Sequence, residues 1–193
     1  MPLASFPHRA PRTALPLWVF GVLAWCFAAS AWADEATITQ AQTSLRNGIH
    51  VLEAKVKLQL GAELVEALQN GVMLPFKIHI EILRRREYVW DEEVAALTQR
   101  YSLQYHALSR QYILTNHNSG VVRNFRSLNS ALDDLGRIKD LPLIDDSLLE
   151  KDARYLARMR VALSSSRLPI PLRLRTYVYS EWDVGSEWYE WFL

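Results

Sequence analysis

Apolar and polar residues alternate along much of this chain, and a period of two is typical of half-buried β-strands. Residues 51–60 place leucine, alanine or valine at every second position, with lysine, glutamate or glutamine between them. The same alternation recurs within residues 75–86, 153–163 and 172–180. Each of these segments predicts a strand with one apolar and one polar face.

The region between residues 87 and 125 predicts shorter strands separated by turns. Asp91-Glu92-Glu93 interrupts an apolar run and is interpreted as a turn. Residues 107–112 predict a tight connection, and the polar residues 116–120, which end in a glycine, predict a second turn. We therefore expect two or three strands before residue 120 and one short strand after it.

Two segments change from the strand period to the helical period. Within residues 61–71, apolar residues form a helical stripe that ends at Asn70-Gly71, a typical helix C-terminus. Within residues 127–142, Ser127 is a candidate N-cap and Pro142 stops the pattern. The stripe of this second predicted helix consists of Leu128, Leu132, Leu135 and Ile138.

Many antiparallel-looking strands with one polar face favour a mainly β fold. We predict an immunoglobulin-like antiparallel β-sandwich with two short helices that serve as crossovers or edge covers. The alternative is an α+β domain in which both helices pack on one face of an antiparallel sheet.

The N-terminal segment has the order of a secretory signal peptide. Residues 1–16 contain two arginines and no acid, residues 17–33 contain no charge, and an A-x-A motif ends at Ala33. We predict a signal peptide over residues 1–33, cleaved after Ala33, and a single β-rich domain over residues 34–193 that is exported to the periplasm. The N-terminal segment then enters the membrane transiently; the alternative is an uncleaved membrane anchor.

Composition limits the chemistry of the mature chain. The only cysteine, Cys26, lies in the predicted leader, so the exported domain must rest on a hydrophobic core and not on disulfides. Removing Arg9 and Arg12 from the 22 basic residues leaves 20 against 21 acidic ones. A near-neutral domain does not attract the negative charge of a nucleic acid through its overall electrostatic field, so we expect no nucleic-acid partner.

No catalytic motif emerges from the sequence. There is no nucleophile elbow and no glycine-rich phosphate loop, and Ser164-Ser165-Ser166 has the composition of a loop. His79 and Glu81 share one face of a predicted strand and could ligate a metal, but two polar residues on a solvated face are the favoured interpretation. We predict no enzyme, no cofactor and no metal site. The remaining mature histidines lack helical zinc spacing; they are His50, His106 and His117.

The C-terminal segment "SEWDVGSEWYEWFL" is unusually aromatic. It predicts a final strand that folds back on residues 172–180 and is buried on both faces, with Trp188 and Phe192 on one side. A binding surface is the competing interpretation, because aromatic rings stack on sugars and lipids. The candidate ligand or partner contacts are Trp182, Trp188, Tyr189, Trp191, Arg154, Arg158 and Arg160.

Six features of the chain form a distinctive series: "GVMLPFKIHIEILRRR", the single Trp90, "RYSLQYHALSRQYIL", "SLNSALDDLGRI", "LPIPLRL" and "SEWDVGSEWYEW". In this series the chain resembles, over about residues 45–192, an exported bacterial family, domain-of-unknown-function family 4390. The resemblance implies a domain of the Gram-negative cell envelope and a link to a membrane histidine kinase. It implies no activity and no catalytic residue.

We therefore expect a periplasmic, non-enzymatic domain that binds a protein partner in the cell envelope or has a structural role there. One alternative is a glycan- or lipid-binding protein that uses the aromatic C-terminus. Another is a small outer-membrane barrel, because barrel strands also alternate and carry aromatic girdles.

Overall fold

The computed structural model describes residues 35–164 and 185–193, all within the compact unit Ala33–Leu193. Two helices, α2 (Ala62–Gln69) and α3 (Leu128–Leu135), and a short 3-10 turn, η2 (Asp146–Leu148), accompany the strands. The strands are β1 (Glu35–Arg46), β2 (Ile49–Gln59), β3 (Leu74–Arg84), β4 (Glu92–His106), β5 (Gln111–Asn116), β6 (Val122–Phe125), β7 (Arg137–Asp145), β8 (Tyr155–Leu163) and β9 (Tyr189–Phe192).

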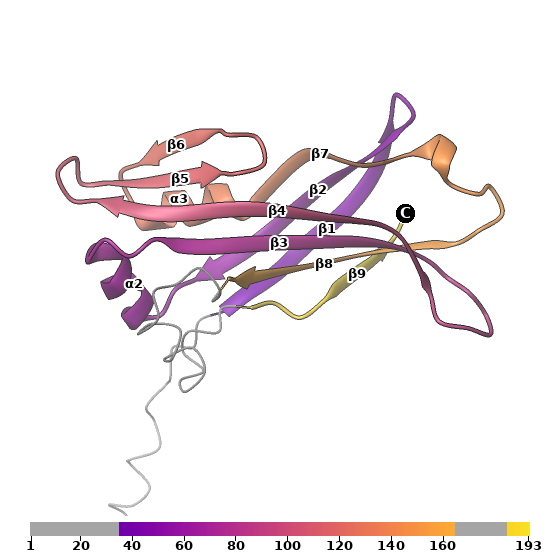
Figure 1. The fold of residues 1–193 in the computed structure, drawn as a ribbon, viewed down its shortest axis with the longest axis horizontal. Coiled ribbons are helices and arrows are strands. Elements are labelled where there is room, and N and C mark those ends of the chain that lie inside the picture. Colours follow the sequence, from indigo (N-terminus) through magenta and orange to yellow (C-terminus); the bar gives the residue numbers. More distant parts are fainter. Residues whose placement is uncertain (1–34, 165–184) are drawn as a thin grey trace, which may run out of the picture. The chain divides into compact units, whose positions relative to one another are not determined.

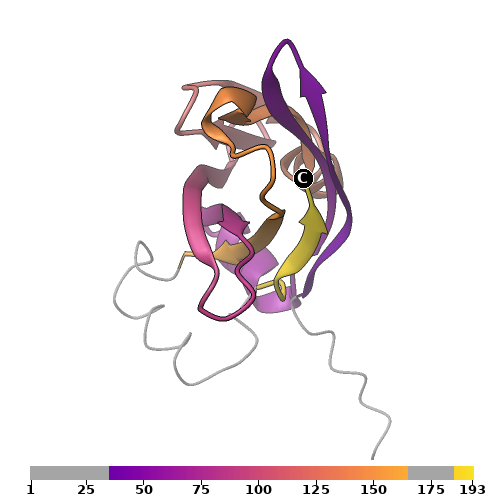
Figure 2. The same cartoon turned by 90° about the vertical axis from the view of Figure 1, so that its right-hand side faces the viewer.

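The strands form two antiparallel sheets (Figure 1). The smaller sheet has the order β1-β2-β7, and the larger sheet has the order β6-β5-β4-β3-β8-β9. Figure 2 shows the β1–β2 hairpin on one side of the domain and the strands of the larger sheet on the other. The predicted mainly β fold with antiparallel sheets and two short helices is confirmed.

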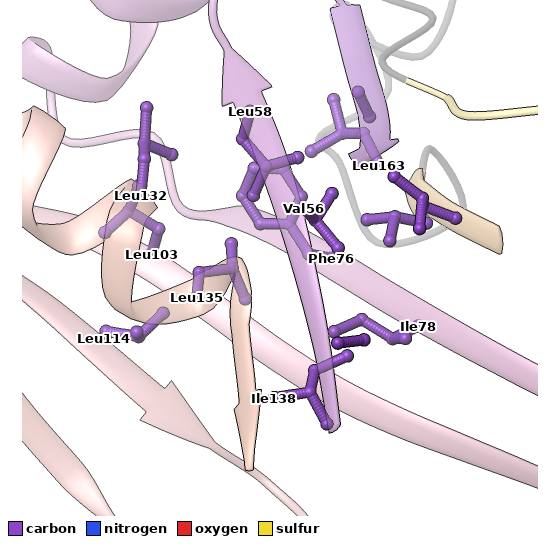
Figure 3. Close-up of a cluster of buried hydrophobic side chains, with 14 of the residues drawn as sticks. Val56, Leu58, Phe76, Ile78, Leu103, Leu114, Leu132, Leu135, Ile138 and Leu163 are labelled. Atoms are coloured by element: carbon purple, nitrogen blue, oxygen red, sulfur yellow. The ribbon is translucent and has the colours of Figure 1, made fainter. Parts of the chain in front are cut away.

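A hydrophobic core fills the space between the sheets (Figure 3). Phe76, Ile78 and Ile80 of β3 are each at most 1 % exposed. Val56 and Leu58 of β2 approach them from the smaller sheet. Each such side chain contributes about 1.5–3 kcal/mol when fully buried, so the alternation in the sequence is what holds the two layers together.

Both predicted helices are present, and their ends follow local signals. Helix α2 ends at Gln69 with Asn70 as its C-cap, and Gly71 follows with a φ of 84°, a conformation that favours glycine. The side chain of Ser127 accepts a hydrogen bond from the backbone N–H of Ser130 at 3.2 Å, which confirms it as the N-cap of α3.

The second helix is shorter than the sequence predicts, because α3 ends at Leu135 and the chain continues as β7. The carbonyl of Gly136 accepts a hydrogen bond from the Val56 N–H at 2.8 Å, which ties this point to β2. Ile138 and Pro142 therefore belong to a strand. A proline is tolerated there because β7 is an edge strand and its register shifts beside this position.

Two further expectations about strands were wrong or incomplete. Glu92 and Glu93 begin β4, opposite Arg84 and Leu83, so the turn lies at residues 85–91 instead of at the acidic triplet. The sequence pattern also did not reveal β1, because a register shift between Ile38 and Gln40 breaks its period of two.

Candidate functional site

Two of the predicted aromatic contacts belong to the core. β9 is an edge strand that pairs with β8, and Tyr189 and Trp191 pack inward. The indole N–H of Trp191 donates to the hydroxyl of Thr43 on β1 at 2.7 Å, which links the two sheets at this edge. Phe192 is 69 % exposed, so β9 is buried on one face only, contrary to expectation. Trp182 and the expected partner segment 172–180 lie outside the described residues.

Trp188 lies on the outer face of the larger sheet, where two arginines cover its ring. The guanidinium carbons of Arg158 and Arg160 lie 4.4 Å and 4.7 Å from the ring centroid. The ring of His79 is 5.8 Å away. These contacts hold the guanidinium groups in place through cation–π attraction, so Trp188 positions arginines and is not an open platform for a sugar.

Arg158 has a structural partner. Its Nε and Nη2 atoms both lie 2.6 Å from Oε2 of Glu81, which is only 7 % exposed. The other oxygen, Oε1, is 2.9 Å from Nε2 of His79, and Nδ1 of His79 is 2.9 Å from the hydroxyl of Thr98. His79 and Glu81 thus share a strand face as expected. Within residues 35–164 and 185–193, no group of three potential ligands is placed to hold a metal ion.

Arg160 lies at the edge of a cationic cavity of about 530 Å³ on the same outer face. Lys77 of β3 and Arg100 of β4 line it directly opposite each other in the sheet register. In the part of the chain that the structure describes, no carboxylate lines this cavity and none pairs with these three cations. The described lining of the cavity therefore carries three cations and no acid.

Arg154 is separate from the other two arginines. It is exposed just before β8 begins, and its carbonyl accepts a hydrogen bond from the Arg85 N–H at 2.9 Å. The three predicted arginine contacts thus do three different things: Arg158 neutralises a buried carboxylate, Arg160 faces a cavity, and Arg154 lies beside the β3–β4 loop.

A serine–histidine pair also occurs on the larger sheet. Nε2 of His117 lies 2.8 Å from the hydroxyl of Ser102. A nucleophilic serine needs room for a substrate and a group that orients the histidine. The adjacent cavity holds only about 10 Å³, and among the described residues no carboxylate is bonded to His117. This geometry fits a partly buried polar contact better than a catalytic pair.

The loop between β3 and β4, residues 85–91, was not predicted as a site. Its tip carries three consecutive apolar residues that face solvent: Tyr88 is 93 % exposed, Val89 is 62 % exposed and Trp90 is 94 % exposed. Large aromatic side chains are rarely this exposed without a function. The sequence signal was a tryptophan outside any apolar period, with charged residues around it. We call residues 88–90 the aromatic tip.

Ion pairs hold the base of this loop. Arg84 pairs with Glu92 and Glu150, and Arg86 also pairs with Glu92. Arg85 pairs with Asp91 at 3.5 Å. The hydrogen bonds that Arg84 donates to Glu150 and Glu92 raise the pKa of Arg84, and the bond that Glu92 accepts from Arg84 lowers the pKa of Glu92. The charges at the base therefore neutralise one another while the aromatic tip projects.

Other exposed apolar residues gather at the same end of the domain, which we call the loop end (Figures 1 and 2). The β1–β2 turn, η2, the C-terminus and the β3–β4 loop all lie at this end, with the β1–β2 turn and the β3–β4 loop at its two sides. Contacts connect them: the Asp146 N–H donates to the Gly48 carbonyl at 2.8 Å, and Glu150 binds Arg84. Besides the aromatic tip, the exposed apolar residues of the loop end are Leu45, Ile49, Leu148 and Phe192.

A family model described as "Domain of unknown function (DUF4390)" matches residues 33–192, so the chain belongs to that family. No curated protein and no solved structure matches the chain. Among the described residues, none of the helices has the length and apolar character needed to cross a bilayer.

Proposed function

We propose that this member of the DUF4390 family is an exported, non-enzymatic domain that binds a protein partner in the cell envelope through its loop end. The observation that carries this proposal is the aromatic tip. Tyr88 and Trp90 are both more than 90 % exposed, although their loop is held at its base by ion pairs.

A loop that ion pairs hold at its base and that exposes aromatic side chains at its tip is well suited to binding a protein. Tryptophan and tyrosine are the commonest residues that dominate protein interfaces, where each contributes about 2 kcal/mol or more. A loop that is already ordered loses little conformational entropy when it binds, so more of this energy becomes affinity. The remaining exposed apolar residues of the loop end belong to the β1–β2 hairpin, η2 and β9 at the same end of the domain.

The charges around the tip favour a protein partner over a bilayer. Attraction to an anionic membrane needs unpaired lysine or arginine near the inserting residues. Arg84, Arg85 and Arg86 are each paired with a carboxylate, so they supply little net positive charge. Arg154 is the one arginine beside this loop that has no ion pair among the described residues, and a single cation adds only about 1 kcal/mol of attraction to an anionic surface. A sugar ligand at the C-terminus is disfavoured because Trp188 is covered by arginines and Trp191 packs into the core.

Paired substitutions test the proposal. We expect Tyr88→Ser with Trp90→Ser to abolish the copurification of a specific envelope protein with the full chain. Leu108→Ser is the matched control, because Leu108 is 93 % exposed in the turn between β4 and β5, away from the loop end. If the same partner is lost in both proteins, or is kept in both, the aromatic tip is not the binding surface.

A further inference from the structure

The outer face of the larger sheet carries cations where sheet pairing disfavours them. Lys77 lies directly opposite Arg100 on β4, and His79, in the next row of the same face, lies between Thr98 and Arg160. Like charges placed opposite each other on neighbouring strands destabilise a sheet. The cations at these positions therefore lower the stability of the sheet, and the fold itself does not require them.

The nearest buried carboxylate does not relieve this charge. Glu81 uses Oε1 for His79 and Oε2 for Arg158, so both of its oxygens are already engaged. Within the described residues, no ion pair involves Lys77, Arg100 or Arg160. The three side chains converge on the cavity of about 530 Å³.

A second cavity of the domain shows the contrast. It measures about 480 Å³ and is lined by residues that include Arg123, Asp134, Arg137 and Asp140. There Nη1 of Arg123 lies 2.7 Å and 2.9 Å from the two carboxylate oxygens of Asp134. Acidic residues thus lie among the cations of the second cavity, and one of them pairs with Arg123, whereas the outer-face cavity has no acid among its described lining residues.

We infer that the outer-face cavity binds a phosphate group of a small molecule or a lipid headgroup, a function distinct from partner binding at the loop end. Two guanidinium groups and an ammonium group match the charge of a phosphate and can donate several charge-assisted hydrogen bonds to it. Trp188 holds one of these groups, that of Arg160, against its ring. The cavity exceeds the size of one phosphate, so it also admits an attached group.

The binding of inorganic phosphate and of glycerol phosphate to the full exported chain tests this inference. Titration at constant ionic strength, followed by calorimetry, should show saturable binding that weakens as salt increases. Lys77→Gln and Arg160→Gln should each lower the affinity about tenfold or more, the loss expected for one charge-assisted contact. The matched controls Lys57→Gln and Arg126→Gln change the same charges at exposed positions elsewhere and should bind as the wild type does.

Thermal unfolding measures phosphate binding in a second way, which also applies to a variant whose stability differs from that of the wild type. Lys77→Gln removes the like-charge pair with Arg100, so its melting temperature without phosphate should rise. Added phosphate should raise that temperature less than it raises the melting temperature of the wild type at the same phosphate concentration. Phosphate should raise the melting temperature of the wild type. A wild-type protein that phosphate neither binds nor stabilises would overturn the inference.

Vesicles distinguish the two sources of the phosphate group. Flotation with phosphatidylglycerol vesicles that depends on Lys77 and Arg160 identifies a lipid headgroup, and binding of free phosphates without flotation identifies a soluble ligand. If neither occurs, or if Lys57→Gln and Arg126→Gln reduce binding as much as the cavity variants do, the cavity is not a phosphate site.

Discussion

The pair formed by Arg158 and Glu81 gives a quantitative test of the outer-face description. Replacing Arg158 by methionine keeps a long apolar stem but leaves the Glu81 carboxylate, 7 % exposed, without its guanidinium partner. Breaking a fully buried pair costs about 3–5 kcal/mol. The side chain of Arg158 is 32 % exposed, and His79 still contacts Glu81, so solvent screening and this second contact reduce the cost. We expect Arg158→Met to lower the free energy of unfolding by about 2 kcal/mol.

The double variant Glu81→Met with Arg158→Met distinguishes the effect of the unpaired charge from the effect of lost side-chain packing. It removes both charges, so no buried carboxylate is left unpaired, and we expect it to unfold within about 1 kcal/mol of the wild type. Arg154→Met is the control, because Arg154 is exposed and no described residue forms a salt bridge with it.

Urea unfolding followed by tryptophan fluorescence measures these differences. A loss of about 2 kcal/mol lowers the urea midpoint of the single variant by about 1 M. An unchanged midpoint for Arg158→Met would show that Arg158 does not stabilise Glu81. A double variant as unstable as the single one would show that packing, and not the unpaired charge, explains the loss.

Three further predictions concern the fold. Trp191→Phe and Thr43→Val should each cost about 1 kcal/mol, and a double-mutant cycle should show coupling because both remove one hydrogen bond; additive losses would contradict this. Gly136→Ala should destabilise the domain by at least 2 kcal/mol in urea, because its methyl group overlaps a backbone carbonyl of β2, and a neutral change would contradict the close approach. Hydrogen bonds from the side chain and backbone of Ser147 lower the pKa of Asp145, so its stabilising effect is present above the ordinary carboxyl pKa and is lost as pH falls through the lowered value. Ser147→Ala should raise that pKa in an NMR titration; an unchanged pKa would contradict the assignment.

Local patterns predicted the central part of the fold. Alternation in β2, β3 and β8 was visible because residues 52–59, 76–80 and 157–163 of these strands keep a period of two between the core and an outer face. The cap at Ser127 and the glycine at Gly71 are short-range signals that the structure reproduces. These features depend on residues a few positions apart, which a sequence displays directly.

The rest depends on contacts between distant segments. The sequence did not predict β1, because a bulge shifts the positions that point inward. The sequence also predicted too long a second helix, because α3 ends where Gly136 bonds to the distant strand β2. Arg158 and Glu81 are 77 residues apart, so nothing local shows that the arginine has a partner. The sequence did not predict the aromatic tip as a site, because its side chains are defined by their exposure. The exposure of a side chain can be recognised only when the positions of all other segments are known.

Site-specific photo-crosslinking in intact cells tests the central claim most directly. A photoreactive amino acid at position 90 in the aromatic tip should crosslink one envelope protein, and the same amino acid at position 108, equally exposed but away from the loop end, should not. Competition by the wild-type domain should remove the product. Crosslinks from position 90 to lipid alone, or the same products from both positions, would contradict the proposal that the loop end binds a protein partner.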